Sequence, residues 1–128
     1  MNDSVEIISI LASLAGEDYC YLTTTGRVTG KPHDIEIWFG AQKASIYLMA
    51  GDHKSDWVKN LLKDPNVAVR IAAQHFAGTA RLVTDEGEEM TSRRMIAHKY
   101  KEFEADGSLS EWAQAALVVA IDLSILPA

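Results

Sequence analysis

The segment Tyr19–Phe39, YCYLTTTGRVTGKPHDIEIWF, carries the clearest fold signal in the sequence. Its first part, Tyr19–Thr25, is rich in β-branched and aromatic residues, which favour a strand. In its last part, Pro32–Phe39, every second residue from position 35 is large and apolar. The glycines and threonine of Gly26–Gly30 between them are typical of a turn. The segment therefore predicts a β-hairpin with one face buried.

Further short strands follow along the chain. Residues 40–43 form a second turn, and the later predicted strands are Ala44–Ala50, Asn66–Ile71, Gln74–Val83 and Leu117–Leu123. We expect successive strands to pair antiparallel in sequence order. Because closure of a sheet removes its exposed edges, this pattern favours a small barrel, in a mainly β fold with flanking helices.

An amphipathic helix is predicted at the N-terminus, over about residues 4–15. Asp3 or Ser4 can cap it, and Gly16 suits its end. Its expected buried face consists of Val5, Ile8, Leu11 and Leu14.

Two more helices are predicted between the later strands. Ser55 caps the first, which Pro65 ends because the residue before a proline avoids the helical region. Its expected buried stripe consists of Trp57, Val58, Leu61 and Leu62. Thr84 caps the second helix, which runs through Lys99 with an acidic start and a basic end.

Composition and charge exclude several classes of protein. The chain has 128 residues, 48% of them hydrophobic, so a single domain over residues 1–128 can bury its own core. Its net charge of −6 disfavours a general nucleic-acid partner. The lone Cys20 and an acidic N-terminus unlike a signal peptide indicate a cytoplasmic protein. Apolar runs fall short of the roughly 20 residues that span a bilayer, so we expect no transmembrane segment.

The turn of the predicted hairpin has the chemistry of a phosphate site. Its glycines permit close backbone approach, its threonines offer hydroxyl donors, and Arg27, Lys31 and His33 can supply positive charge. The alternative is an ordinary hairpin turn with solvated basic residues. The segment matches neither the P-loop, since Pro32 follows Lys31, nor the dinucleotide fingerprint.

A second candidate segment is Ala50–Asn60, where a strand of small residues leads into a helix. Free N–H groups at the helix start can bind a polar ring edge, with Lys54 as a ligand and Trp57 beside a planar group. The alternative for Trp57 is a place in the core. The four histidines are scattered and the cysteine is alone, so neither a metal site nor a hydrolytic site is expected.

The order of these motifs over Tyr21–Val83 resembles the deazaflavin-dependent nitroreductase and reductase family, within the flavin-binding split-barrel superfamily related to pyridoxamine phosphate oxidase. The resemblance implies a six-stranded antiparallel split β-barrel of the FMN-binding type, and reduced coenzyme F-420 as hydride donor. The activity it implies is hydride transfer to a small electrophilic acceptor such as a quinone, an enone or a nitro compound.

By position, the resemblance also implies the cofactor-binding residues, whereas the catalytic residues stay unknown. The phosphate loop is implied at Thr24, Thr25, Gly26, Lys31 and His33, and the ring segment at Ala50, Gly51, Lys54, Trp57 and Asn60. The family commonly has a basic residue where Val28 stands and an arginine where His33 stands. These departures keep two alternatives open: an FMN-dependent oxidoreductase, and a flavin- or haem-binding protein of the same fold without turnover.

The resemblance finally implies a homodimer, and a small barrel alone is too shallow to bury a three-ring cofactor. Trp38 and Trp112 are the exposed aromatic residues expected at the seam. The alternative is that the helix Thr84–Lys99 folds over Trp38 within one chain.

Overall fold

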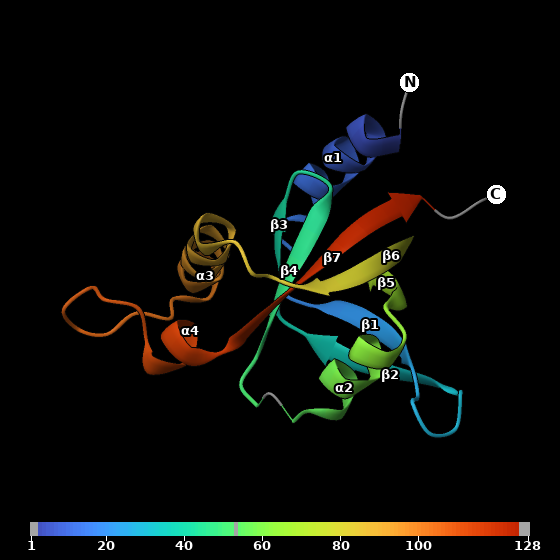
Figure 1. The fold of residues 1–128 in the computed structure, drawn as a ribbon. Helices are drawn as coiled ribbons and strands as arrows, with labels where there is room; N and C mark the ends of the chain where they lie inside the picture. Colours follow the sequence, from blue (N-terminus) through green and yellow to red (C-terminus); the bar gives the residue numbers. More distant parts are fainter. Residues whose placement is uncertain (1–2, 53, 126–128) are drawn as a thin grey trace.

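A seven-stranded antiparallel sheet with flanking helices forms the structure, a computed structural model that describes residues 3–52 and 54–125 (Figure 1). The strands are β1 (Cys20–Thr25), β2 (Pro32–Ile37), β3 (Gly40–Gln42), β4 (Ser45–Ala50), β5 (Asn66–Ile71), β6 (Gln74–Leu82) and β7 (Leu117–Ile125). The helices are α1 (Asp3–Leu14), α2 (Asp56–Lys63), α3 (Glu86–Tyr100) and α4 (Glu111–Ala115). The expectation of a mainly β fold is confirmed.

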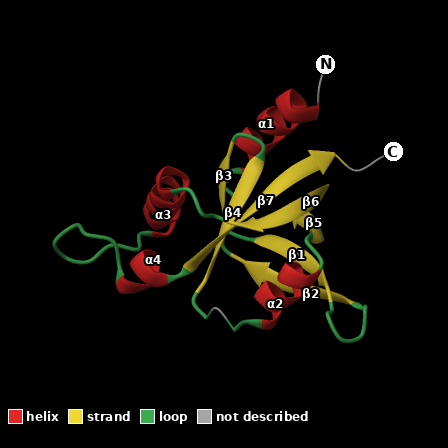
Figure 2. Cartoon of the chain, viewed as in Figure 1, coloured by secondary structure: helices red, strands yellow, loops and turns green. Residues whose placement is uncertain are grey.

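The predicted hairpin is present, with β1 and β2 paired from Cys20↔Ile37 to Thr25↔Pro32. The strand order across the sheet is β2-β1-β5-β6-β7-β4-β3, and all the pairings are antiparallel. The sheet curls into a half-barrel, in which the last strand, β7, lies between β6 and β4 (Figure 2). The hairpin β1–β2 forms one edge of the sheet and the hairpin β3–β4 the other, with β5, β6 and β7 between them, which is the split-barrel arrangement.

Two details of the strand prediction are wrong. Residues Gly40–Gln42 form a strand, not a turn, so the sheet has seven strands instead of six. Pairing follows sequence order for β1–β2, β5–β6 and β6–β7 but not around β4, which pairs with β3 and β7 in place of β2 and β5. The chain leaves the β2 direction at Trp38 and Phe39, and this break starts a new hairpin at the opposite edge.

Strand β4 and the first half of β7 are buried on both faces. Alternate residues such as Leu48 and Ile121 face the core inside the curl, while Tyr47 and Val118 face a second core beneath α3 and α4. Strand β5 has one covered face only, since its buried residues alternate with more exposed ones. The molecule is therefore thick on the α3 side and thin at the β1–β2 side.

Helices α1 and α2 lie at opposite ends of the curled sheet (Figure 1). Helix α1 buries Ile7 and Leu11, whereas Val5 and Ile8 of the predicted face are exposed. The side chains of Asp3 and Ser4, the predicted caps, lie outside the described residues. Helix α2 has its N-cap at Ser55 as expected and buries its middle, but Leu62 of the predicted stripe is 58% exposed. In both helices the buried face is therefore turned relative to the face predicted from residue spacing.

An aromatic cluster fastens α3 and α4 to the end of β2. Trp38 stacks flat on Tyr100, with ring centroids 4.2 Å apart, and meets Trp112 edge-on at 5.7 Å. Trp38 and Trp112 are therefore half-buried within one chain, and the prediction that they are exposed is wrong. Helix α3 folds over Trp38, as the alternative proposed, although its cap is Asp85 in place of Thr84. The short helix α4, which holds Trp112, was not predicted.

The Tyr100 hydroxyl should stabilise the junction between α3 and the sheet. It accepts the N–H of Phe39 at 3.0 Å and donates to the carbonyl of Asp18 at 2.7 Å. We expect Tyr100→Phe to lower the free energy of unfolding by about 1 kcal/mol, because both groups lose a partner while the stacked ring is kept. Urea unfolding measures this loss. Tyr19→Phe, at an exposed tyrosine, is the control, and an equal loss there would contradict the assignment.

A charged network joins α3 to β4 and β6 on the outer face. The Glu88 carboxylate accepts the Tyr47 hydroxyl at 2.6 Å and both terminal nitrogens of Arg81, at 2.8 and 2.7 Å. Hydrogen bonds from Arg81 and then from Tyr47 lower the pKa of Glu88 from 4.5 to about 2. The stabilisation from ionised Glu88 is therefore present above about pH 4.5 and is lost as the pH falls towards 2.

Replacing Glu88 should flatten the acid limb of the stability curve. In Glu88→Gln no proton is taken up at this position, so the free energy of unfolding should fall less steeply between pH 4.5 and 2 than in the wild type. Urea denaturation at a series of pH values tests this. Glu104→Gln, in the exposed loop before α4, should leave the acid limb unchanged. Parallel wild-type and Glu88→Gln curves would refute the effect.

Candidate functional site

A cavity of about 400 Å³ lies between the β1–β2 loop and α2, and we call it the loop–helix cavity. It joins the two segments that the sequence singled out, and its volume falls within the range of small-molecule sites. Its lining residues are Thr24, Gly26, Arg27, Val28, Thr29, His33, Asp34, Ile35, Asp56, Trp57 and Asn60.

The β1–β2 loop is held by its own backbone. The Gly26 N–H donates to the carbonyl of Lys31 at 2.8 Å, and the Gly30 N–H donates to the carbonyl of Gly26 at 2.8 Å. Gly30 has φ +74°, a conformation that favours glycine. A Cβ atom at position 26 would lie 2.6 Å from Nε2 of His33, so glycine there lets the imidazole pack against the loop. The two glycines thus set the shape of this wall.

The side-chain amide of Asn60 joins α2 to this loop. It is 4% exposed; its Nδ2 donates to Oγ1 of Thr24 at 3.2 Å, and its Oδ1 accepts the backbone N–H of Arg27 at 3.1 Å. The same oxygen accepts NH1 of the Arg27 guanidinium at 2.9 Å. One buried amide therefore fixes β1, the loop and the Arg27 side chain at once.

The Arg27 guanidinium also pairs with the first residue of α2. Its NH2 lies 3.1 Å from Oδ1 of Asp56, and its NH1 lies 3.5 Å from the carbonyl oxygen of that residue. Lys63 adds a bond from the far end of the helix, donating Nζ to the carbonyl of Arg27 at 2.9 Å. The cationic groups of this region are therefore arranged around the loop backbone.

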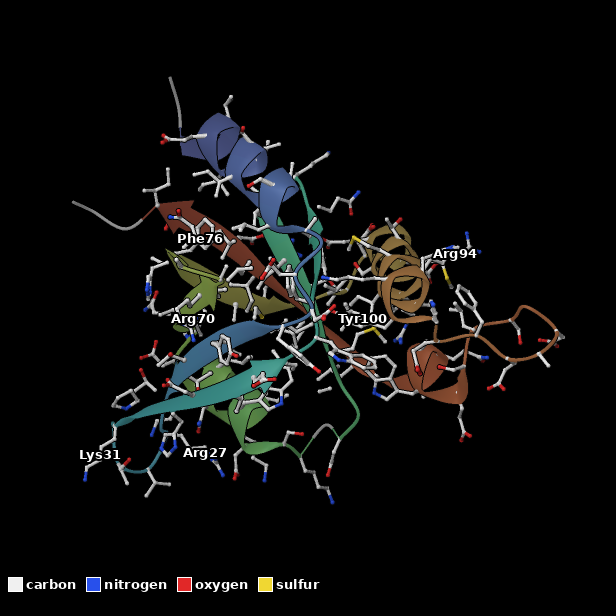
Figure 3. All side chains as sticks on the ribbon, turned by 180° about the vertical axis from the view of Figure 1, so that it is seen from behind. Arg27, Lys31, Arg70, Phe76, Arg94 and Tyr100 are labelled. Atoms are coloured by element: carbon white, nitrogen blue, oxygen red, sulfur yellow. The ribbon has the colours of Figure 1, made fainter. Side chains whose placement is uncertain are left out.

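The structure brings half of the predicted cofactor-binding residues together. These residues line the loop–helix cavity: Thr24, Gly26, His33, Trp57 and Asn60. Thr25 lines a neighbouring cavity of about 380 Å³ with Lys63. Lys31 ends the loop directly before β2, and it lies at the same end of the molecule as Arg27 (Figure 3).

The other three predicted residues lie along the chain before α2 and do not line the cavity. Ala50 is 3% exposed and pairs with Leu117 in the sheet. Gly51 lies beside Trp112, whose Nε1 would be 3.4 Å from a Cβ atom at position 51. Lys54 is exposed, and its backbone N–H donates to the carboxylate of Asp52 at 2.8 Å.

Some lining residues were not among the predicted site residues. The loop run indicated Arg27 as a source of positive charge, but not its bonds to Asn60 and Asp56. Asp56 lies in the first turn of α2, where the helix dipole alone favours a carboxylate, and Asp34 and Ile35 lie on β2. Only the packing of α2 against the loop reveals them, because the partners are 29 to 33 residues apart in sequence.

Charge is unevenly distributed between this region and the rest of the chain. Residues 23–37 and 51–64 together hold five Lys and Arg and five Asp and Glu, so the whole net charge of −6 lies elsewhere. An anionic ligand therefore meets no net charge in these two segments, whereas the rest of the chain taken together is acidic.

Two further findings concern the described residues only. No group of three or more His, Cys, Asp or Glu among them is arranged to hold a metal ion. None of the described helices is both long and apolar enough to cross a membrane.

Solved structures of three proteins share this fold at low sequence identity. An F-420-H2 dependent reductase, FDR-A, is 21% identical with a TM-score of 0.65, over 81% of this chain and 93% of its own. A Listeria innocua protein provisionally assigned as a pyridoxamine 5'-phosphate oxidase is 20% identical with a TM-score of 0.69, over 92% and 93%. General Stress Protein 26 from Bacillus anthracis str. Sterne is 17% identical with a TM-score of 0.64, over 92% and 87%. These likenesses confirm the split-barrel fold.

Sequence comparison identifies the family. No curated protein sequence matches the chain. A family model described as F-420H(2)-dependent quinone reductase matches residues 4–114, which include the whole β1–β2 hairpin, α2 and α3. Because the match extends over most of the domain, the chain belongs to the F-420H(2)-dependent quinone reductase family, whose members are oxidoreductases that use coenzyme F-420.

Proposed function

We propose that this enzyme transfers hydride from reduced F-420 to a small electrophilic acceptor of the quinone class, with the cofactor bound at the loop–helix cavity. The observation that carries the proposal is the cavity itself, which joins both predicted segments in the part of the chain without net charge. Family membership makes the alternatives of FMN as cofactor and of a carrier without turnover unnecessary. Enone and nitro acceptors share the same electrophilic chemistry and form the comparison set.

The residues present fit a planar polar ring that carries a phosphate. Trp57 and Ile35, both partly buried, offer apolar surface within the cavity. Lys31, at the β2 end of the loop, offers an ammonium donor to a phosphate, whereas the Gly26 N–H already donates to the carbonyl of Lys31. We assign the phosphate end to the loop, and the ring end to Gly51, Lys54 and Trp57 along the approach to α2.

The role of this chain is to bind and orient. F-420, when bound in its reduced form, supplies the hydride, so the protein needs no nucleophile of its own. Asn60 fixes the distance between the loop and α2 through its bonds to Thr24 and Arg27. That fixed separation sets the position of a ligand held between them, and positioning is a large part of the rate enhancement in such reactions.

Lys31→Ala should weaken cofactor binding. Titration with F-420 should quench the fluorescence of the coenzyme, and loss of one charged hydrogen bond should cost about 1–3 kcal/mol of binding free energy. The wild type should also oxidise reduced F-420 when a quinone such as menadione is added.

Arg94→Ala is the matched control, since it removes an exposed cation from α3 on the other side of the molecule (Figure 3). Its affinity should equal that of the wild type. Saturating F-420 with no change in fluorescence, or binding without oxidation by any quinone, enone or nitro compound, would contradict the proposed function.

We also propose that the enzyme works as a homodimer. The rim of the loop–helix cavity is open, since Val28, Thr29, His33 and Asp56 are all exposed. Val28 is 88% exposed and Leu62, on α2, is 58% exposed, so a second subunit over this end would cover apolar surface. A solved structure described as a domain-swapped dimer is 21% identical to this chain with a TM-score of 0.61.

Light scattering at micromolar concentration should give twice the chain mass of 14.1 kDa. Val28→Asp should shift the protein towards the monomer, because a carboxylate in the seam would be desolvated. Met90→Asp, at an exposed apolar residue of α3, should leave the dimer intact. A wild-type mass near 14.1 kDa would rule out the dimer.

A further inference from the structure

An exposed carboxylate neutralises the main cation of the loop–helix cavity. We propose that Asp56 sets the affinity of this cavity for anions by pairing with Arg27, and that the phosphate of F-420 competes with the Asp56 carboxylate for the guanidinium. This inference rests on the proposed function and assigns Asp56 as a specificity-determining residue outside the phosphate loop.

Arg27 and Asp56 differ in how firmly they are held. The guanidinium is 31% exposed and is fixed by the buried amide of Asn60, at 2.9 Å from NH1. The Asp56 side chain is 85% exposed, and its carboxylate oxygen Oδ1 accepts NH2 of Arg27 at 3.1 Å. An exposed pair of this kind contributes little stability, so the carboxylate can turn to water at low cost while Arg27 stays in place.

The guanidinium also keeps free donors. NH1 donates to Oδ1 of Asn60 and to the Asp56 carbonyl, and NH2 donates one hydrogen bond to the Asp56 carboxylate. Among the described residues, Nε and the second N–H of NH2 have no partner. Nε and NH2 share one edge of the guanidinium, and such an edge can bind two oxygens of a phosphate once the Asp56 carboxylate has turned away.

The charges facing Arg27 explain why Asp56 matters. The lining includes one guanidinium and two carboxylates, Asp34 and Asp56, with His33 beside them. Lys63 contacts only the backbone of Arg27, and Asp34 accepts the Thr23 hydroxyl at 2.6 Å. Removing the Asp56 charge takes the lining from one excess negative charge to none when His33 is neutral, and so favours an anion.

Asp56→Asn should tighten binding of F-420 about two- to five-fold at low salt, the range expected for an exposed ion pair. The gain should shrink as salt screens the charges. Glu36→Gln, which makes the same charge change on exposed β2 outside the cavity, should leave the affinity unchanged. In the Asp56→Asn, Arg27→Gln double variant the gain should vanish. Fluorescence titration measures all four proteins.

A second arm uses inorganic pyrophosphate, so that the inference can be judged without the cofactor. Pyrophosphate should raise the melting temperature of Asp56→Asn more than that of Glu36→Gln, and Asp56→Ser should respond as Asp56→Asn does. If the wild type fails to bind F-420, the proposed function fails, and this arm alone decides the role of Asp56. Equal responses of Asp56→Asn and Glu36→Gln in both arms would overturn the inference.

Discussion

The buried side-chain amide of Asn60 is the interaction on which the candidate site depends. It must donate to the Thr24 hydroxyl and accept from the Arg27 backbone at the same time. Among side chains of this size only asparagine offers a donor and an acceptor in one plane, since aspartate lacks the N–H and leucine lacks both. A change at this position would leave buried polar groups on two elements unpaired. The cavity exists because this one residue holds α2 against the loop.

The division of the core explains why the site lies at the β1–β2 end. Strand β4 and the first half of β7 are covered on both faces, so their ends are taken up by packing against α3 and α4. Helix α2 packs at the end of the hairpin β1–β2, and β2 is an edge strand. Backbone and side chains of the loop are therefore available to a ligand. The β4, β7, α3 and α4 side holds the second core, and the β1–β2 and α2 side holds the candidate site.

Local signals predicted the parts of the fold that depend on local chemistry. The β1–β2 hairpin follows from strand alternation and Gly26 and Gly30, and α2 follows from Ser55 and Pro65. Strand β3 was missed because it has only three residues, Gly40–Gln42, and helix α4 because it is short and its Ala113 carbonyl is held by a distant partner, Arg93. Distant contacts also explain the aromatic cluster. Strand alternation predicts that Trp38 points outward, but in the structure its ring stacks on Tyr100 and is half-buried.

The candidate site follows the same rule. Gly26 and His33 were identified from the chemistry of the loop and Trp57 from the start of α2, whereas Asn60 was implied by the family resemblance alone. The contact between Arg27 and Asp56 was not, because a carboxylate in a first helical turn already has a sufficient local explanation in the helix dipole. In an enzyme whose cofactor carries the hydride chemistry, selection acts on position and charge, and not on a nucleophile with a recognisable motif. Glycines and polar residues of the loop can therefore be recognised in the sequence. The burial of the Asn60 amide and the pairing of Arg27 with Asp56 depend on the packing of α2 against the loop, so only the structure reveals them.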